Sequence, residues 1–145
     1  MWWNSDLTFK KLPWATKGSS WALRMECFLV FLITLYLFHK LGGNWLMYGL
    51  VMVGIDISLV GYLVNNHVGG LVYNIGHSYI IPRIVLLIAL MTDTDSVILF
   101  ALVWNSHISL DRALGYGLKH ESFHLTHLGP IGKQKKLKES TPIVD

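Results

Sequence analysis

Long apolar runs separated by short polar segments are the main feature of this chain. A transmembrane helix needs about 20 mostly apolar residues to cross the hydrocarbon core of a bilayer. Within lipid, a helix is one of the few structures that satisfies all of its own backbone hydrogen bonds. We therefore predict an all-α protein, a four-helix transmembrane bundle with short loops. The expected helices span residues 21–38, 45–64, 71–91 and 96–114.

Two of these runs depart from a simple apolar helix. Pro82 lies in the middle of the third run, where it is expected to kink the helix because proline removes a backbone hydrogen bond. The fourth run is apolar only from Ser96 to Leu110, which is shorter than the roughly 20 residues needed. We expect it to continue as a helix to Leu114, with Arg112 extending its charged end to the membrane surface.

The composition agrees with a membrane protein whose surroundings are a lipid bilayer. The 145 residues are 52% hydrophobic and only 14% charged, whereas soluble globular domains contain about 25% charged residues. This length allows a single domain. We divide the chain into a polar and aromatic leader (1–20), a transmembrane domain (21–118) and a basic cytoplasmic tail (119–145).

The chain carries a net charge of +3, and most of its basic residues gather at its two ends. Lysine and arginine accumulate on the cytoplasmic side of transmembrane helices. Both termini are therefore predicted to be cytoplasmic, in a multi-pass protein of the cytoplasmic (plasma) membrane. The residues concerned are Lys10, Lys11, Lys17 and Arg24 before the first run, and Lys119, Lys133, Lys135, Lys136 and Lys138 after the last.

The tail is the expected contact with anionic lipid, since each basic residue near a negatively charged membrane contributes about 1 kcal/mol. Nucleic acid is not an expected partner, because no aromatic residues alternate with the lysines of the tail. The sequence also lacks the G-x-G-x-x-G and P-loop patterns of nucleotide binding and the G-x-S-x-G pattern of serine hydrolases.

Ionisable residues inside or beside the apolar runs are the candidates for function. A charged side chain at the bilayer centre costs about 2.5–3.5 kcal/mol on insertion scales, so such residues are usually paired or functional. Given cytoplasmic termini, most of them fall in the inner half of the bundle, with Asp56 near its middle. They are Glu26, Asp56, His77, Arg83, His107 and Asp111.

Helical spacing places some of these residues together. His107 and Asp111 are four residues apart and share a helix face, and so do Tyr73 and His77. Imidazole and carboxylate groups bind divalent metals and act as general acids and bases. A divalent metal is therefore a candidate cofactor, with His77, His107 and Asp111 as its ligands. The hypothetical catalytic set is Glu26, Asp56, His77, His107 and Asp111.

The leading hypothesis is a site in the cytoplasmic half of the bundle for acid–base or metal-assisted chemistry on a lipophilic substrate. Residues expected near the inner surface are candidates for holding an anionic headgroup or phosphate. This substrate-binding set is Tyr73, Asn74, Arg112, Lys119 and His127.

Other interpretations stay open at this point. Polar residues in transmembrane bundles often hydrogen-bond between helices to hold them together. A structural or partner-binding protein without catalysis is therefore the second hypothesis. A proton or small-solute conductor is a third hypothesis, as a homo-oligomer because four short helices make a poor pore alone. Asp56 and Arg83 are expected at similar depth and are candidates for a buried ion pair.

Two further patterns carry less weight. His120, Glu121 and His124 match the zinc-protease pattern H-E-x-x-H. No long amphipathic helix pattern surrounds them, so we interpret the match as chance in a polar segment beside the membrane. Several glycines are expected to let helices approach closely, namely Gly49, Gly54, Gly69, Gly70 and Gly76.

Several stretches between residues 23 and 132 resemble a known family. They are residues 23–26 (LRME), 56–63 (DISLVGYL), 69–70 (GG), 73–79 (YNIGHSY), 107–119 (HISLDRALGYGLK) and 126–129 (THLG). On these stretches the chain resembles the small integral membrane family catalogued as domain of unknown function 4260. The resemblance implies a compact four-helix membrane protein.

The same resemblance marks particular residues. It implies that Glu26, Asp56, Asn74, His77, His107, Asp111, Arg112, Lys119 and His127 fall on motif positions of the family. Arg83, His120, Glu121 and His124 depart from the family pattern. This departure favours the interpretation of the H-E-x-x-H match as chance.

Overall fold

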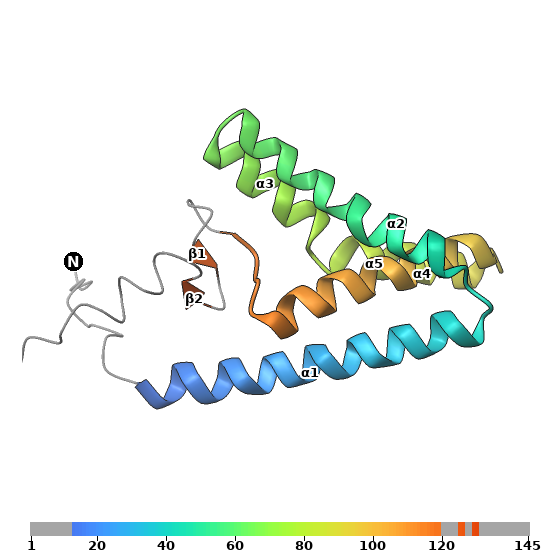
Figure 1. Cartoon of the computed structure of the whole chain (residues 1–145), viewed down its shortest axis with the longest axis horizontal. Helices are drawn as coiled ribbons and strands as arrows, with labels where there is room; N and C mark the ends of the chain where they lie inside the picture. The colour runs from blue at the N-terminus through green and yellow to red at the C-terminus, as the bar shows by residue number, and fades with distance from the viewer. Residues whose placement is uncertain (1–12, 120–124, 127–128, 131–145) are drawn as a thin grey trace, which may run out of the picture.

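A computed structural model describes residues 13–119, 125–126 and 129–130 of the chain (Figure 1). The fold is all-α, as predicted, apart from a two-residue antiparallel pairing near the C-terminus. The elements are α1 (Pro13–Lys40), α2 (Trp45–Ile55), the 3-10 helix η2 (Asp56–Leu63), α3 (Asn66–Gly76), α4 (Ile80–Met91), α5 (Asp95–Leu114), β1 (Leu125–Thr126) and β2 (Gly129–Pro130).

Four helical segments are long and apolar enough to cross a membrane, so the chain is a multi-pass membrane protein. Large apolar side chains such as Leu29, Leu50 and Val53 point outward from the bundle, and so much exposed apolar surface is typical of contact with lipid or with another protein. The four segments are Trp21–Lys40, Trp45–Leu63, Asn66–Met91 and Asp95–Leu114.

Helix α5 is the centre of the bundle, with α1 along one side and α2 and α4 packed on the others (Figure 1). Its residues Ala101, Val103 and Ile108 are almost completely buried. The hydroxyls of Tyr48 and Ser106 are 2.6 Å apart and join α2 to α5. Helix α5 is capped after Leu114 by Gly115, whose φ of +100° suits glycine and allows the Tyr116 N–H to bond the Asp111 carbonyl at 2.8 Å.

The turn between α1 and α2 is fixed by one aromatic side chain. Phe38 is fully buried, and its ring meets those of Trp45 and Tyr48 edge-on at centroid distances of 5.5 and 5.1 Å. A side chain on Gly43 would collide with the Phe38 ring. Asn44 then caps α2 by accepting two backbone N–H groups. This turn holds α2 against α5.

The second span covers the predicted residues, but its backbone changes at Asp56. The α-helix ends at Ile55, and residues Asp56–Leu63 wind more tightly as η2. Helix α3 packs closely against η2 because Gly61 and Gly69 face each other, with the Gly61 Cβ position 3.2 Å from the Gly69 Cα. This close approach sets the position of α3 and of the residues that follow it.

The glycine prediction was confirmed in part. Gly69 meets Tyr62, and a Cβ on Gly76 would lie 3.2 Å from the Ser58 Cβ, so both allow close packing. Gly70 is buried. The prediction was wrong for Gly49 and Gly54, because no described atom of a neighbouring element lies within 4 Å of a Cβ built at either position.

The third span differs from the prediction in its start and in its break. The helix begins at Asn66 rather than Leu71, because the Asn65 side chain caps it by accepting the Val68 N–H at 2.8 Å. The span is broken at residues 77–79 instead of being kinked at Pro82. A proline ring collides with the carbonyl four residues earlier, here that of Ser78, and is tolerated in the first turn of a helix. Pro82 accordingly lies in the first turn of α4.

The first residues of α1 and the last residues of α5 point to the same end of the bundle (Figure 1). This is the arrangement expected for an even number of spans. The side of the membrane to which that end belongs stays a prediction.

Candidate functional site

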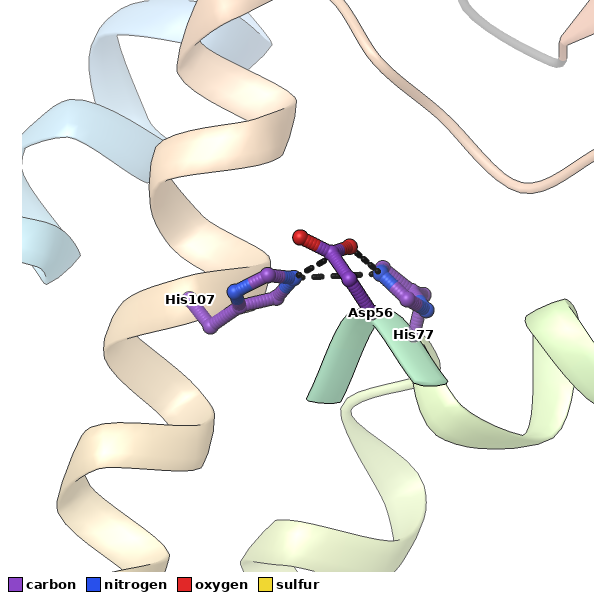
Figure 2. A group of neighbouring side chains, drawn as sticks. All are labelled: Asp56, His77 and His107. Atoms are coloured by element: carbon purple, nitrogen blue, oxygen red, sulfur yellow. Dashed lines mark hydrogen bonds and ion pairs between the residues drawn. The ribbon is translucent and has the colours of Figure 1, made fainter. Parts of the chain in front are cut away.

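Asp56, His77 and His107 converge from three elements (Figure 2). Asp56 is the first residue of η2, His77 lies in the break after α3, and His107 is in the second half of α5. The two imidazole Nε2 atoms are 3.1 Å apart. The Asp56 Oδ1 atom is 3.6 Å from His77 Nε2 and 3.5 Å from His107 Nε2. We call these three residues the triad.

The orientation of the His77 ring is fixed on two sides. Its Nδ1 lies 3.1 Å from the Tyr73 carbonyl oxygen, which can only accept a hydrogen bond. The Nδ1 therefore carries the proton, and the Nε2 lone pair of the neutral ring points into the triad. The Tyr73 ring stacks on the imidazole at a centroid distance of 3.8 Å. The predicted pairing of Tyr73 with His77 is thus confirmed as a contact.

A second carboxylate approaches the same nitrogens. The Oδ2 atom of Asp111 lies 3.5 Å from His77 Nε2 and 3.7 Å from His107 Nε2, and the Tyr73 hydroxyl donates to it at 3.4 Å. With the two histidines Asp111 makes a triangle with edges of 3.1, 3.5 and 3.7 Å, almost the same as the triangle that Asp56 makes with them. The structure therefore brings together four of the five residues proposed as catalytic, with Asp111 beside the triad.

Burial differs sharply within the triad. The side chains of His77 and His107 are only 4% and 6% exposed, whereas that of Asp56 is 49% exposed. Buried imidazoles need polar partners, because an unpaired polar group in an apolar interior is costly. The side of the triad at Asp56 is therefore the accessible one, from which a metal or substrate can reach the two histidines.

The triad fits a small divalent metal. With metal–ligand bonds of about 2.0–2.2 Å, ligand atoms lie about 3.3–3.6 Å apart in a tetrahedral site and about 2.8–3.1 Å apart in an octahedral one. The three edges of the triad measure 3.1, 3.5 and 3.6 Å. Two histidines and one carboxylate are also a recurrent ligand set for transition metals that keep open positions for substrate.

Asn74 and Lys119 close the site on the side of the chain termini. The Asn74 amide donates to the Lys119 carbonyl at 2.8 Å and accepts the Lys119 N–H at 2.7 Å. The Lys119 side chain is buried, with its Nζ 5.0 Å from the centre of the Tyr73 ring. Burial lowers the pKa of the Lys119 amine, and the nearby Asp111 carboxylate opposes this shift. Binding of a headgroup by these residues stays a prediction.

Two arginines lie over the ring of Tyr79, which is not part of the triad. The guanidinium carbons of Arg83 and Arg112 lie 4.3 and 4.5 Å from the centre of the Tyr79 ring, within the range of cation–π attraction. The Tyr79 hydroxyl donates to Ser109 at 3.0 Å. The alternative pairing of Arg83 with Asp56 is not formed among the described residues, because Asp56 turns to the two histidines instead.

Glu26 is not part of the cluster. It is exposed on α1, whereas the face of α1 that contacts α5 carries the buried Thr34 and Phe38. It forms no hydrogen bond or ion pair with any residue in the described ranges. Its depth was predicted from sequence position alone, and the rotation of α1 directs it away from the triad.

Sequence reasoning missed two residues that support the site. The Arg24 guanidinium donates to the carbonyls of Ala113 and Leu114 at 2.8 and 3.1 Å, at the end of α5 where carbonyls lack helical partners. Ser58 Oγ lies 3.4 Å from His77 Nδ1. Arg24 was interpreted from the sequence only as a topology signal and as part of a family stretch, and no role was assigned to Ser58.

The H-E-x-x-H match and one predicted binding residue cannot be placed. His120, Glu121, His124 and His127 lie outside the described residues, as does most of the basic tail. Their roles stay as predicted from the sequence.

The sequence profile of one protein family, described as Domain of unknown function (DUF4260), matches residues 20–131. No curated protein and no solved structure matches the chain significantly. The matched range contains all four membrane spans, the triad and Asp111. The match covers well over half of the chain and agrees with the resemblance noted in the sequence, so the chain belongs to this family, whose function is unknown.

Proposed function

We propose that the triad binds one divalent transition metal and that the protein uses this site for acid–base or metal-assisted chemistry on a lipophilic substrate. The single observation that carries the proposal is the convergence of Asp56 Oδ1, His77 Nε2 and His107 Nε2 at mutual distances of 3.1–3.6 Å. The proposed location is the cytoplasmic half of the plasma membrane.

The ligand set favours a catalytic over a structural metal. Structural zinc sites usually have four protein ligands, whereas catalytic ones have three and leave a position for water or substrate. A bound metal of this kind supplies a Lewis acid and lowers the pKa of its water to about 7. Asp111, beside both imidazoles and bonded by the Tyr73 hydroxyl, is the group placed to accept a proton from such a water.

The hydrogen bond made by the ring nitrogen of His77 that faces away from the triad supports the metal proposal. Metal-binding histidines usually donate their other ring N–H to a carbonyl or carboxylate, which fixes the tautomer. His77 has this contact with the Tyr73 carbonyl. The stacked Tyr73 ring further restricts its orientation, so the imidazole lone pair is aimed before a metal arrives.

A proton path is the second candidate, and one observation favours it. The 3.1 Å separation of the two Nε2 atoms is also a hydrogen-bond distance, so the histidines can share a proton in the absence of metal. Carboxylates at Asp56 and Asp111 flank the pair. Chains of histidine and carboxylate inside membranes are typical of proton relays. The purely structural hypothesis assigns the same contacts to helix association.

Metal analysis of the detergent-purified full chain tests the proposal. The wild-type protein, loaded with Zn²⁺, Mn²⁺ or Fe²⁺ and desalted, is expected to hold one ion per chain. Asp56→Asn, His77→Ala and His107→Ala should each lose it while keeping the helical circular dichroism spectrum. His67→Ala is the matched control, because His67 is exposed on α3 and outside the triad.

The result also separates the candidates. If the wild-type protein retains no metal under any of these conditions, the metal proposal is refuted. Proton flux into proteoliposomes that disappears with Asp56→Asn would then support the proton path. Absence of both metal and flux would leave helix association as the role of these contacts.

A further inference from the structure

An apolar groove lies against α2 and α5 and has a volume of about 450 Å³. Ligand-binding pockets typically have volumes of about 300–1,000 Å³. Four residues between Leu50 and Ile55 line it from α2, and Phe100 and Trp104 line it from α5. Gly76, the last residue of α3, completes the lining.

Each element that lines the groove has a lining residue within three positions of a triad residue in the sequence. Ile55 is followed directly by Asp56, and Gly76 is followed directly by His77. Trp104 lies one helical turn before His107 on α5. The triad therefore lies beside the lining of the groove along all three elements, close enough for one end of a bound molecule to approach it.

The walls offer almost nothing to a polar ligand. Leucine, valine, isoleucine and phenylalanine side chains have no hydrogen-bonding group. The one indole donor, Trp104 Nε1, already bonds the Gly76 carbonyl at 2.7 Å. This bond also fixes the tryptophan ring against the end of α3. The groove thus matches an apolar chain, and polar recognition is confined to its end.

The groove opens toward lipid. Leu50 is 67% exposed, and α2 buries none of its residues among the described parts of the chain. The lining residues lie in the middle of the span Trp45–Leu63 rather than at its ends. A ligand can therefore move in sideways from the hydrocarbon without passing through water, and Asp56 is the exposed member of the triad on its arrival.

We infer that this groove holds one acyl chain of a single-chain amphiphile, whose oxygen-bearing end reaches the triad. A free fatty acid and an acyl ester share this chemistry. The inference rests on the proposed function in one respect, since it takes the triad as the polar end of the site. The inference adds the class of the substrate, which the geometry of the triad alone does not indicate.

Photolabelling tests the inference on the full chain in phosphatidylcholine nanodiscs. The probe is a palmitate analogue with a diazirine in the middle of its chain, and labelled peptides are identified by mass spectrometry. Labels are expected at residues 50–55 and 100–104, with saturation as the probe concentration rises. Unlabelled palmitate and lysophosphatidylcholine serve as competitors. Stronger competition by the first indicates a free acid, and by the second an ester.

Two glycines of α2 provide a matched pair of variants. A Cβ at Gly54 or Gly49 meets no atom of a neighbouring element within 4 Å, so a side chain can leave the backbone at either position without collision. Only Gly54 lines the groove. Gly54→Leu is expected to reduce saturable labelling by about tenfold because its side chain fills the volume that the ligand needs, and Gly49→Leu should label like the wild type. Leu50→Trp is a second way to narrow the groove.

The outcomes separate this inference from the proposed function. Labelling that does not saturate and is equal in the wild type, Gly54→Leu and Gly49→Leu would mean that bulk lipid merely touches α2, and would overturn the inference. Saturable groove labelling in a wild-type protein that binds no metal would refute the proposed metal site but support the groove. A protein that binds a metal but shows no saturable labelling would support the proposed metal site and refute the acyl-chain groove.

Discussion

The two carboxylates near the histidines are expected to differ in their importance for metal binding. Asp56 and Asp111 lie at similar distances from the two imidazoles, 3.6 and 3.5 Å for Asp56 and 3.5 and 3.7 Å for Asp111. We assign the ligand role to Asp56, whereas the sequence had favoured Asp111 as the carboxylate ligand. Asp56→Asn and Asp111→Asn keep the size of each side chain and remove its charge. They therefore separate the two ligand sets without creating a cavity.

The expected magnitudes follow from these positions. Loss of a residue that only supports a ligand typically lowers metal affinity by about 10–100-fold, which is about 1.4–2.7 kcal/mol. Asp111, which touches the imidazoles from outside the triad, is assigned to this class. Asp56→Asn replaces a direct anionic ligand by a neutral amide, so its loss should exceed 100-fold, or more than about 2.7 kcal/mol.

Competition with a fluorescent zinc chelator, in detergent and at constant pH, measures these affinities. Asp93→Asn is the control, because Asp93 is exposed in the turn before α5. Weaker binding by Asp111→Asn than by Asp56→Asn would show that the carboxylate ligand is Asp111. It would refute the assignment made from the structure and restore the ligand set predicted from the sequence.

Four further outcomes are expected. Phe38→Ala should destabilise the protein by about 3–5 kcal/mol, as for other buried phenylalanines. Thermal unfolding monitored by circular dichroism measures this loss. Tyr36→Ala, at an exposed position of the same helix, should have little effect. Arg24→Gln should cost about 1–3 kcal/mol because carbonyls of Ala113 and Leu114 lose their partner, and faster hydrogen exchange limited to the end of α5 would verify it. Metal occupancy should fall as the pH is lowered, since protons compete with the metal for the imidazole nitrogens; occupancy that is constant from neutral to acidic pH would contradict histidine ligation. Reporter fusions should place both ends of the chain in the cytoplasm, and ends on opposite faces would contradict four spans.

The sequence was sufficient to predict the spans and much of the site. Apolar length determines where helices can cross lipid, and a spacing of four residues places side chains on one face. The contacts of His107 with Asp111 and of Tyr73 with His77 follow from this rule. The convergence of Asp56 with the histidines followed from topology, because antiparallel spans bring distant residues to one depth.

The sequence does not predict how each helix is rotated about its own axis, and therefore which of its faces points into the bundle. Helix α1 is apolar around most of its circumference, so its sequence does not indicate which face meets α5. Glu26 was assigned to the site by depth and points elsewhere. Arg83 was matched to Asp56 by depth, but its guanidinium lies on the Tyr79 ring. Two residues at one level of a bundle can lie on opposite sides of it.

Backbone irregularities occur at two of the three candidate ligands, and this argues against helix association as their only role. Asp56 begins a 3-10 segment within the second span, and His77 lies in the break of the third. Irregular backbone inside a membrane exposes unpaired polar groups and is tolerated only where protein or a polar cavity surrounds it. Tight 3-10 turns within helices and broken spans often mark functional sites.

Polar side chains on unbroken helices would be enough to hold a bundle together, as Tyr48 and Ser106 do between α2 and α5. The break at residues 77–79 instead sends neighbouring side chains in different directions. The His77 ring faces His107, whereas the Tyr79 side chain contacts Ser109 and the guanidinium of Arg112. A continuous helix would have kept the direction of α3 through these positions. The irregular backbone therefore aims the imidazole at His107 and the two carboxylates, which helix association alone would not require.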